Sequence, residues 1–544
     1  MASPTTISGI ASGIDWQKTV DLLMQIESQP MQRLVERQDE YERKQSAWSS
    51  IQTNLETFQS RSKAIDTRDE LLKKSATSSD TSVLSVSATS NAVSGNHTIV
   101  VNQLAQAEVE VHSGFADLNS TPVHNGPGSG TFTYQLGSGS NVAVTVPAGT
   151  TLTGLVQLIN SDTNNPGVIA STIDDGGGSN PVHLVLTSKE TGASNTITIV
   201  SETLDNGDFS SGQWTNTQAA QDSEIRVDGY PPSSWITRES NVIDDVLEGV
   251  TLTLKDTDAT GVQITIADDL SSIKQSIKDW VKAYNDVMTE IRTDTRYDTE
   301  NEIQGILAGD SQIENLRTKL TEIVINEIPG LPSDATFSNL SAIGITTGAG
   351  GQLTVDDSDL QEALEENIDD VADLFVLTNS STSPSLEYFA RTENTKGGSY
   401  AVVASYTAAG KLDPSGTNTI DGKAATVEND TYLVGADGTS VEGLRIRFIN
   451  PGGGPSSVSG TIRLGTGAGV MADNLVEQVT DSIDGMITTV KDGYQDQIDA
   501  LDKQIEAYEE RLSVKRDSLT RKFLAMEQAV SAAQNQSQWL GAVG

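Results

Sequence analysis

The sequence of 544 residues contains no cysteine, only four histidines and 5% aromatic residues. Without cysteine the chain forms no disulfide, and a zinc site would depend on histidine and carboxylates alone. The histidines, His97, His112, His124 and His183, show no ligand spacing such as H-E-x-x-H. Residues 256–267 begin like a calcium loop but place Ala267 where the loop needs glutamate. The sequence therefore predicts no metal site, and the absence of cysteine fits a protein of the oxidising cell exterior.

Basic residues are also scarce, with 35 Lys and Arg against 75 Asp and Glu, for a formal net charge of −40. Such a surface repels phosphate backbones and anionic lipid head groups. Apolar runs of about 18 residues, the length that spans a bilayer, are missing too. We therefore expect neither a nucleic acid nor a membrane as a partner.

The first residues, Met1 to Gly9, lack the basic and apolar regions of a secretory signal peptide. If the protein is exported, we expect a route without a cleaved leader.

Enzyme motifs are missing or incomplete. There is no G-x-S-x-G elbow, and residues 416–424 resemble a P-loop only faintly, because the spacing is one residue too long and Ala424 replaces the magnesium-binding hydroxyl. Residues 465–469 resemble a dinucleotide loop, but Val470 stands where the last glycine belongs. We interpret the first as a turn and the second as a joint before a helix. The sequence predicts no catalysis and no cofactor.

What the sequence does contain is a heptad pattern near each end. Lys44 and Lys515 interrupt the two seams, so the register is imperfect. Each pattern fits either a helical hairpin within the chain or contact with a partner. The seam residues are Leu34, Tyr41, Trp48, Leu55 and Phe58 near the N-terminus, and Ile498, Leu501, Ile505, Leu512, Leu519 and Met526 near the C-terminus.

The extreme ends, residues 1–27 and 520–544, have too little surrounding chain to bury their own apolar side chains. We therefore expect them to bind partners. We expect Pro30 to break or kink the first helix. Gly485 and Gly493 should weaken or divide a helix over residues 472–535. The apolar residues that we expect to contact partners at these two ends are Ile7, Ile10, Ile14, Phe523, Trp539 and Leu540.

The middle of the chain alternates like β-strands, for example in the pair Val250–Leu254 and Val262–Ile266. The predicted class is α+β multidomain, with N- and C-terminal helices forming a coiled-coil stalk and β-rich head domains inserted in mid-chain. The expected segments are a flexible or amphipathic start (1–30), an N-terminal coiled-coil helix (31–75), β-rich head domains (76–268), a helical domain packing with the stalk (269–376), a second β-rich domain (377–470) and a C-terminal coiled-coil helix (471–544).

Several motifs follow one another in the order of a known family. They are Ile7–Asp15, Leu22–Glu27 with Pro30, Gly95–Ala105, Thr150–Asn160, Gly351–Asp356 and Phe523–Glu527. In these residues the chain resembles the bacterial flagellar filament cap family, also called hook-associated protein 2. Residues from about 150 to 200 are similar to that family's hook-type repeat.

The resemblance implies a structural protein at the distal tip of the flagellum that promotes folding and polymerisation of exported flagellin and prevents its loss. It implies a ring of about five copies, with flagellin, hook–filament junction proteins and a cytoplasmic export chaperone at the C-terminal helix as further partners. It also implies export through the flagellar type III apparatus to the cell exterior.

Two alternatives stay open: another axial flagellar protein, such as a junction component, or a surface adhesin, which is also a possible secondary role. The only candidate aromatic side chains for glycan binding are Trp214, Tyr230 and Trp235. The terminal helices hold the residues expected to contact partners or other copies: Ile7, Ile10, Ile14, Leu34, Tyr41, Trp48, Leu55, Phe58, Ile498, Leu501, Ile505, Leu512, Leu519, Phe523, Met526, Trp539 and Leu540.

Overall fold

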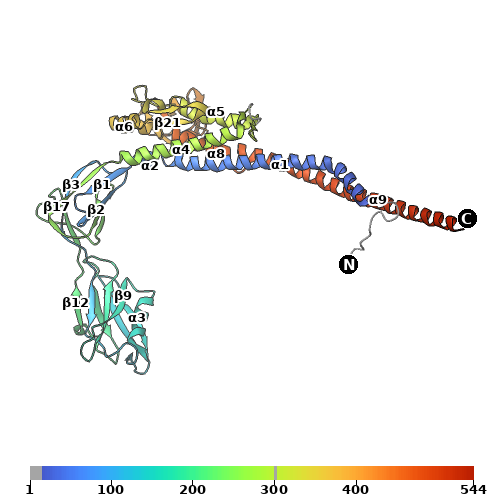
Figure 1. The fold of residues 1–544 in the computed structure, drawn as a ribbon. Helices are drawn as coiled ribbons and strands as arrows, with labels where there is room; N and C mark the ends of the chain where they lie inside the picture. Colours follow the sequence, from blue (N-terminus) through green and yellow to red (C-terminus); the bar gives the residue numbers. More distant parts are fainter. Residues whose placement is uncertain (1–14, 299–302, 544) are drawn as a thin grey trace. The chain divides into compact units, whose positions relative to one another are not determined.

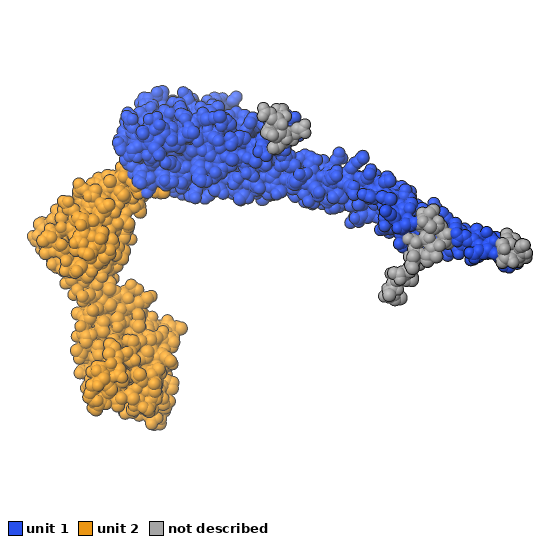
Figure 2. Space-filling view, in the orientation of Figure 1, with its two compact units in different colours: residues 1–71, 270–544 blue, residues 72–269 orange. Residues whose placement is uncertain are grey.

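The structure is a computed structural model that describes residues 15–298 and 303–543. The chain folds into two compact units, the larger formed by residues 1–71 with 270–544 and the smaller by residues 72–269 (Figure 2). The larger unit is therefore discontinuous in sequence, and the smaller one is inserted between its parts.

In the larger unit two long helices, α1 (Trp16–Lys63) and α9 (Met486–Val543), lie side by side (Figure 1). They are antiparallel. The side chain of Gln45 bonds Gln495, whereas Gln38, which lies earlier in α1, bonds Asp502, which lies later in α9. Asp15 caps α1 by accepting a hydrogen bond from the backbone N–H of Lys18.

Helix α1 runs through Pro30, where the sequence predicted a break or kink. Pro30 is exposed, so the carbonyl that loses its partner there can bond water. The two predicted glycine breaks differ. Gly485 lies in the turn that separates α8 (Ala468–Thr480) from α9, whereas α9 continues through Gly493.

Helix α4 (Leu270–Thr295) packs on the second half of α1 and completes a three-helix core with α8. The ring of Phe58 lies 5.4 Å from that of Trp280 and 5.8 Å from that of Tyr284. The indole of Trp280 donates to the buried Ser62 hydroxyl at 3.0 Å. The remaining elements of this helical part are α2 (Arg68–Leu71), β18 (Tyr297–Asp298), β19 (Ile303–Gln304), α5 (Ser311–Ile325), η2 (Leu340–Ile343), β20 (Ile345–Thr347), η3 (Ala349–Gly351), β21 (Leu353–Val355), α6 (Asp357–Glu366) and α7 (Ile368–Asp373).

A small β-domain is inserted between α7 and α8, built from a five-stranded sheet, β22-β30-β24-β25-β26, and a four-stranded sheet, β23-β29-β28-β27. Alternate residues of β24 face its core, among them Tyr400, Val402 and Ala404. The strands are β22 (Leu377–Ser381), β23 (Leu386–Ala390), β24 (Gly398–Tyr406), β25 (Thr419–Ile420), β26 (Lys423–Ala424), β27 (Thr426–Glu428), β28 (Tyr432–Val434), β29 (Arg445–Phe448) and β30 (Ser456–Thr466).

The smaller unit contains two β-modules. The first has the sheets β1-β17-β3-β13-β14 and β15-β16-β2 around one core. Both expected strands exist, Val250–Leu254 as β16 and Val262–Ile266 within β17, but they belong to different sheets and do not pair with each other. The strands are β1 (Lys74–Ser78), β2 (Leu84–Ala88), β3 (Gly95–Gln103), β13 (Ser223–Val227), β14 (Ile236–Arg238), β15 (Val242–Leu247), β16 (Val250–Leu254) and β17 (Asp258–Asp268).

The second module is a sandwich of the sheets β12-β4-β10-β9 and β11-β6-β7, with a short pair β5-β8. Thr151 caps its helix α3 (Leu152–Ser161), because its hydroxyl accepts a hydrogen bond from the N–H of Gly154. The other elements are β4 (Val109–His112), β5 (Pro122–His124), β6 (Ser129–Leu136), β7 (Val142–Pro147), β8 (Thr150–Thr151), β9 (Val168–Asp174), β10 (Val182–Ser188), β11 (Ile197–Glu202), η1 (Ser211–Gln213) and β12 (Trp214–Gln218).

The α+β class with paired terminal helices and β-rich domains inserted in mid-chain is thus confirmed.

One carboxyl group makes the stability of the larger unit depend on pH. Asp66, just beyond α1, is half-buried, and burial followed by its hydrogen bond with Glu70 raises its pKa to about 7. An unfolded chain releases this proton near the ordinary value of 3.8. Between these two values the folded state binds more protons, so this group lowers stability as pH rises and the loss is complete above pH 7.

We therefore predict that Asp66→Asn raises the melting temperature of the larger unit more at pH 8 than at pH 5, measured by scanning calorimetry of the full chain. The exposed Asp437→Asn is the matched control on the same unit. An effect of Asp66→Asn that is equal at both pH values would contradict this account.

Candidate functional site

The paired helices α1 and α9 hold most of the predicted contact residues, and the structure divides those residues into two groups. Trp48, Leu55 and Phe58 are fully buried, and Ile498 and Leu501 nearly so. Their contacts are made within the chain, so they hold the helix pair together. Half-buried positions along the pair are Leu34, Tyr41, Ile505, Leu512, Leu519, Phe523 and Met526.

The seam between the helices is polar at several points. Lys44, one of the predicted interruptions, bonds Glu40 at 2.7 Å. The ring of Tyr41 lies 5.9 Å from that of Tyr494. The Tyr494 hydroxyl donates to Asp310 at 3.1 Å, and burial together with this carboxylate raises the Tyr494 pKa to about 12. The contacts that join the two helices, such as Tyr41 with Tyr494 and Gln45 with Gln495, fix the register while burying less apolar surface than an all-leucine seam.

Towards the start of α1, the helix pair is held by one aromatic contact and two ion pairs. Trp16 is buried and stacks on Phe523, with ring centroids 6.4 Å apart. Glu27 lies 3.3 Å from Lys515, the second predicted interruption, and Asp21 pairs with Arg516. Both ion pairs are exposed, and exposed pairs contribute about 0–1 kcal/mol each.

On its outer side the same stretch of α1 exposes three large apolar residues, which we name the distal strip: Leu22, Leu23 and Ile26. They are 54%, 38% and 62% exposed. Leu22 and Ile26 are four residues apart, and Leu23 and Ile26 three apart, so they share one helix face. The sequence analysis did not identify this strip, although three apolar residues outside the heptad seam were a signal for it.

Helix α9 continues past its contact with Trp16. Residues 524–543 form about 30 Å of helix at 1.5 Å per residue. On this part Trp539 is 66% exposed and Leu524 is 36% exposed. The predicted contacts Ile7, Ile10 and Ile14, and the side chain of Leu540, lie outside the described part of the chain.

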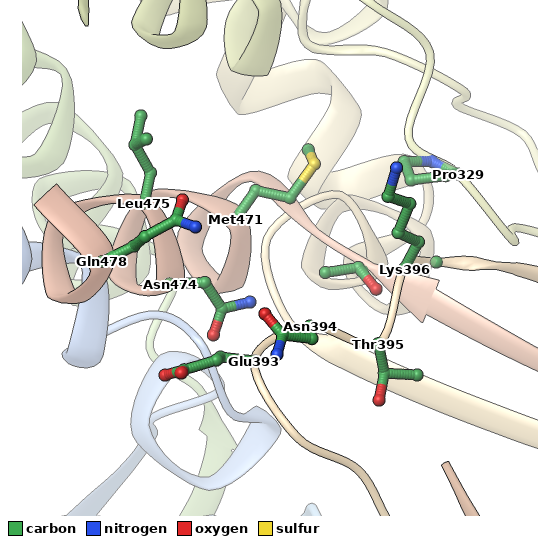
Figure 3. Close-up of a pocket in the computed structure, with 11 residues that line it drawn as sticks. Pro329, Glu393, Asn394, Thr395, Lys396, Met471, Asn474, Leu475 and Gln478 are labelled. Atoms are coloured by element: carbon green, nitrogen blue, oxygen red, sulfur yellow. The ribbon is translucent and has the colours of Figure 1, made fainter. Parts of the chain in front are cut away.

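A cavity of about 410 Å³ opens between α8 and the loop 393–397 of the inserted β-domain (Figure 3). Met471, Leu475 and Gln478 approach it from α8, whereas Lys396 approaches from the loop beside Pro329. The described lining offers amides, one ammonium and one carboxylate but no histidine. These side chains can donate and accept hydrogen bonds.

The four histidines lie in the smaller unit and interact locally. His97 and His124 lie 2.8 Å from Asp228 and Asp205, and His183 lies 3.3 Å from Asp175. Burial lowers the pKa of His112, which stacks on Phe115. Among the described residues no group of three or more His, Asp or Glu side chains could hold a metal ion. Within the same residues, each helix is too short or too polar to cross a bilayer.

Three family models match the chain. They are described as flagellar hook-associated protein 2 N-terminus over residues 12–108, flagellin hook IN motif over 131–190, and flagellar hook-associated protein 2 C-terminus over 220–535. The last alone spans more than half of the chain.

The chain belongs to the flagellar hook-associated protein 2 family.

Individual relatives agree with this assignment. The chain is 30% identical over 395 residues to flagellar hook-associated protein 2 of Escherichia coli K12, a match that covers 69% of this chain and 81% of that protein. It is 29% identical over 401 residues to the A-type flagellar hook-associated protein 2 of Pseudomonas aeruginosa, with the same coverage of both. The crystal structure of the D1-D2-D3 domains of the flagellar cap protein FliD from E. coli is similar, with a TM-score of 0.51 and 30% identity over 60% of this chain and 89% of that chain.

The contact between Trp16 and Phe523 yields a prediction for this hook-associated protein 2 chain. Trp16→Ala removes a buried ring at a place where, among the described residues, Val20 is also buried and the ion pairs are exposed. We expect amide exchange of residues 16–30 and 515–527 to accelerate by roughly tenfold or more, with little change in the α4 core, measured by hydrogen–deuterium exchange.

The matched control is Leu22→Ala, on the exposed face of the same helix, which should leave exchange nearly unchanged. Equal acceleration by both substitutions would show that the aromatic contact does not hold the two helices together here.

Proposed function

We propose that this chain is a non-enzymatic structural protein that caps the distal end of the bacterial flagellum, where it promotes flagellin folding and polymerisation and prevents flagellin loss. Membership of the hook-associated protein 2 family supports this role. The similar E. coli structure is itself named a flagellar cap protein.

One structural observation supports the mechanism most directly. The helix pair is closed on itself around Trp48 and Phe58, but it exposes the distal strip and residues 524–543. The apolar side chains near Trp48 and Phe58 are buried within the chain, whereas those of the distal strip and of residues 524–543 are exposed. The exposed part of the helix pair is therefore suited to docking against other helices. Complete burial of one leucine or isoleucine contributes about 1.5–3 kcal/mol. The distal strip can therefore add a few kcal/mol, which suits a contact that forms and breaks repeatedly.

The ion pairs Glu27–Lys515 and Asp21–Arg516 support the same mechanism. They keep α1 and α9 in register. Breaking them when the two helices separate costs little free energy, because both pairs are exposed to water. The two helices can thus adjust to a partner without breaking the core around Phe58.

The predicted contact residues at this end remain part of the proposal. Half-buried Leu512, Leu519, Phe523 and Met526, exposed Trp539, and Ile7, Ile10, Ile14 and Leu540 would meet flagellin or hook–filament junction proteins. Residues 1–75 and 471–544 would form the leg, 269–376 the helical domain beside it, and 76–268 with 377–470 the head.

The finer assignments follow the family resemblance. We propose a ring of about five copies, a cytoplasmic export chaperone bound to α9, and export through the flagellar type III apparatus. The exposed part of α9 at residues 524–543 supports a chaperone site there, since it offers apolar residues before any ring exists.

Adhesion remains a prediction without a specific observation in its favour. Tyr230 is 71% exposed, but Trp214 packs partly on the sandwich core, and the Arg226 guanidinium lies 3.8 Å above the ring of Trp235. These three side chains do not present a common aromatic surface.

Deletion of residues 528–544 tests the proposed function while it keeps the contact between Trp16 and Phe523. In a strain whose own copy is removed, we expect flagellin to be shed as monomer into the medium, quantified by immunoblotting. Immunoblotting of the truncated protein in the same medium distinguishes lost docking from lost export, because the deletion also removes most of the proposed chaperone site at residues 524–543. Normal filaments would contradict docking through the end of α9.

A point substitution provides a second test on the distal strip. Ile26→Glu places a charge on the strip and should shorten filaments and raise shed flagellin, because burying that charge in a helix contact is unfavourable. Gln32→Glu adds the same charge at an exposed position elsewhere on α1 and serves as the matched control.

A further inference from the structure

The sandwich of residues 105–218 has two outer surfaces whose composition differs from the rest of the chain. Strand register defines the first, which we name the apolar face: on β9, β10 and β4, Ile169 lies opposite Thr187, which lies opposite Val109. Val185 and Val111 also pair on this side, but Val185 is only 4% exposed. Ile173 is on the same side of β9 as Ile169, and the two are 54% and 47% exposed.

The second surface, the threonine face, is the outer side of the sheet β11-β6-β7. Its members include Thr131 paired with Thr145, Gln135 paired with Thr198, and the neighbouring Ala143 and Ser201. Ala143 and Thr145 are exposed and alternate with the buried valines of β7.

Neither face contains Asp, Glu, Lys or Arg at an outward-facing strand position, although the whole chain has a net charge of −40. The one carboxylate of β4, Glu110, points to the other side, where it lies opposite Leu186 and accepts a hydrogen bond from Asn216 at 2.9 Å. A molecule this acidic repels its own copies over most of its surface. On the apolar face His183 lies opposite Ile173 and pairs with Asp175 at 3.3 Å. Apart from this pair, the two faces are the places where copies can approach with the least repulsion.

The two faces point in opposite directions. The sheets share one core, to which one contributes Phe132 and Val144 and the other Leu184 and Leu186. Because side chains alternate along a strand, each outer face lies on the side of its sheet away from that core. A protein with complementary faces on opposite sides can associate head to tail, and such association closes into a ring when the rotation allows.

Contact through the edge of strand β9 is blocked. The Asn160 side chain donates to the carbonyl of Ala170 at 2.8 Å and accepts from its N–H, also at 2.8 Å. The backbone groups in the middle of the β9 edge are therefore already hydrogen-bonded. This edge cannot pair with a strand of a neighbouring copy.

We propose that the apolar face of one copy packs on the threonine face of the next copy in the ring. This inference rests on the proposed function, since it names the subunit contact of the proposed ring. Four strands about 4.8 Å apart and about five residues long give a face of roughly 300 Å². A stable interface buries about 800 Å² per partner, so one such contact is weak and is maintained by ring closure and by contacts elsewhere.

The cysteine-free chain allows a direct test. Two single-cysteine full-length chains, Ile173→Cys and Thr145→Cys, are mixed and treated with a short bismaleimide. Both positions are exposed, so the substitutions should be tolerated. We expect cross-linked dimers in the mixture at least roughly tenfold above those of either chain alone, with the pair Ile173→Cys and Ser457→Cys as the matched control.

Dimers formed by the Ile173→Cys chain alone would indicate two apolar faces in contact and overturn the proposal. Equal yields from the test and control mixtures would overturn it as well. In either case a strain that still retains flagellin and builds filaments would keep the proposed capping function intact, so the two failures can be distinguished.

A second measurement does not depend on cross-linking. Ile173→Asp places a charge on the apolar face and should weaken self-association of the full chain by roughly tenfold or more, measured by sedimentation velocity. Ile173→Val keeps the face apolar and should preserve association. Unchanged association of a folded Ile173→Asp chain would overturn the proposal.

Discussion

The structure depends on the antiparallel pairing of α1 with α9, two helices that lie at opposite ends of the sequence. Their contact brings Trp48, Leu55 and Phe58 onto a common core with α4 and α8. Because this pairing joins the two ends of the chain, every other domain becomes an insertion between them. The smaller unit, residues 72–269, and the β-domain of residues 377–466 are both attached in this way.

The strength of the pairing changes along its length, and this gradient connects stability with function. Near Phe58 the aromatic rings of Trp280 and Tyr284 from α4 pack on α1, and removal of any of these rings would leave a large cavity. Near Trp16 the described residues provide one stacked aromatic pair, the buried Val20 and two exposed ion pairs. One helix pair thus combines a rigid part that supports the β-domains with a weakly held part suited to transient partners.

Heptad spacing and strand alternation in the sequence predicted the helices and strands that depend on neighbouring residues. The heptads placed Trp48 and Leu55 on a helix seam, and alternation placed β16 and part of β17. Pairing over long sequence distances could not be read in this way, so the separate sheets of β16 and β17 were missed. Pro30 was predicted to break or kink α1; the helix continues through it, because its exposed position lets water satisfy the carbonyl. The distal strip was missed because exposure depends on where the partner helix lies.

The most direct test of the capping role is the position of the protein on a growing filament. Since the chain has no cysteine, a single exposed Ser457→Cys can be labelled with a maleimide dye on living cells. The account predicts one fluorescent spot at the distal end of each filament, which stays there as a second flagellin label extends the filament behind it. A label left at the base of the filament, or distributed along it, would contradict the capping role.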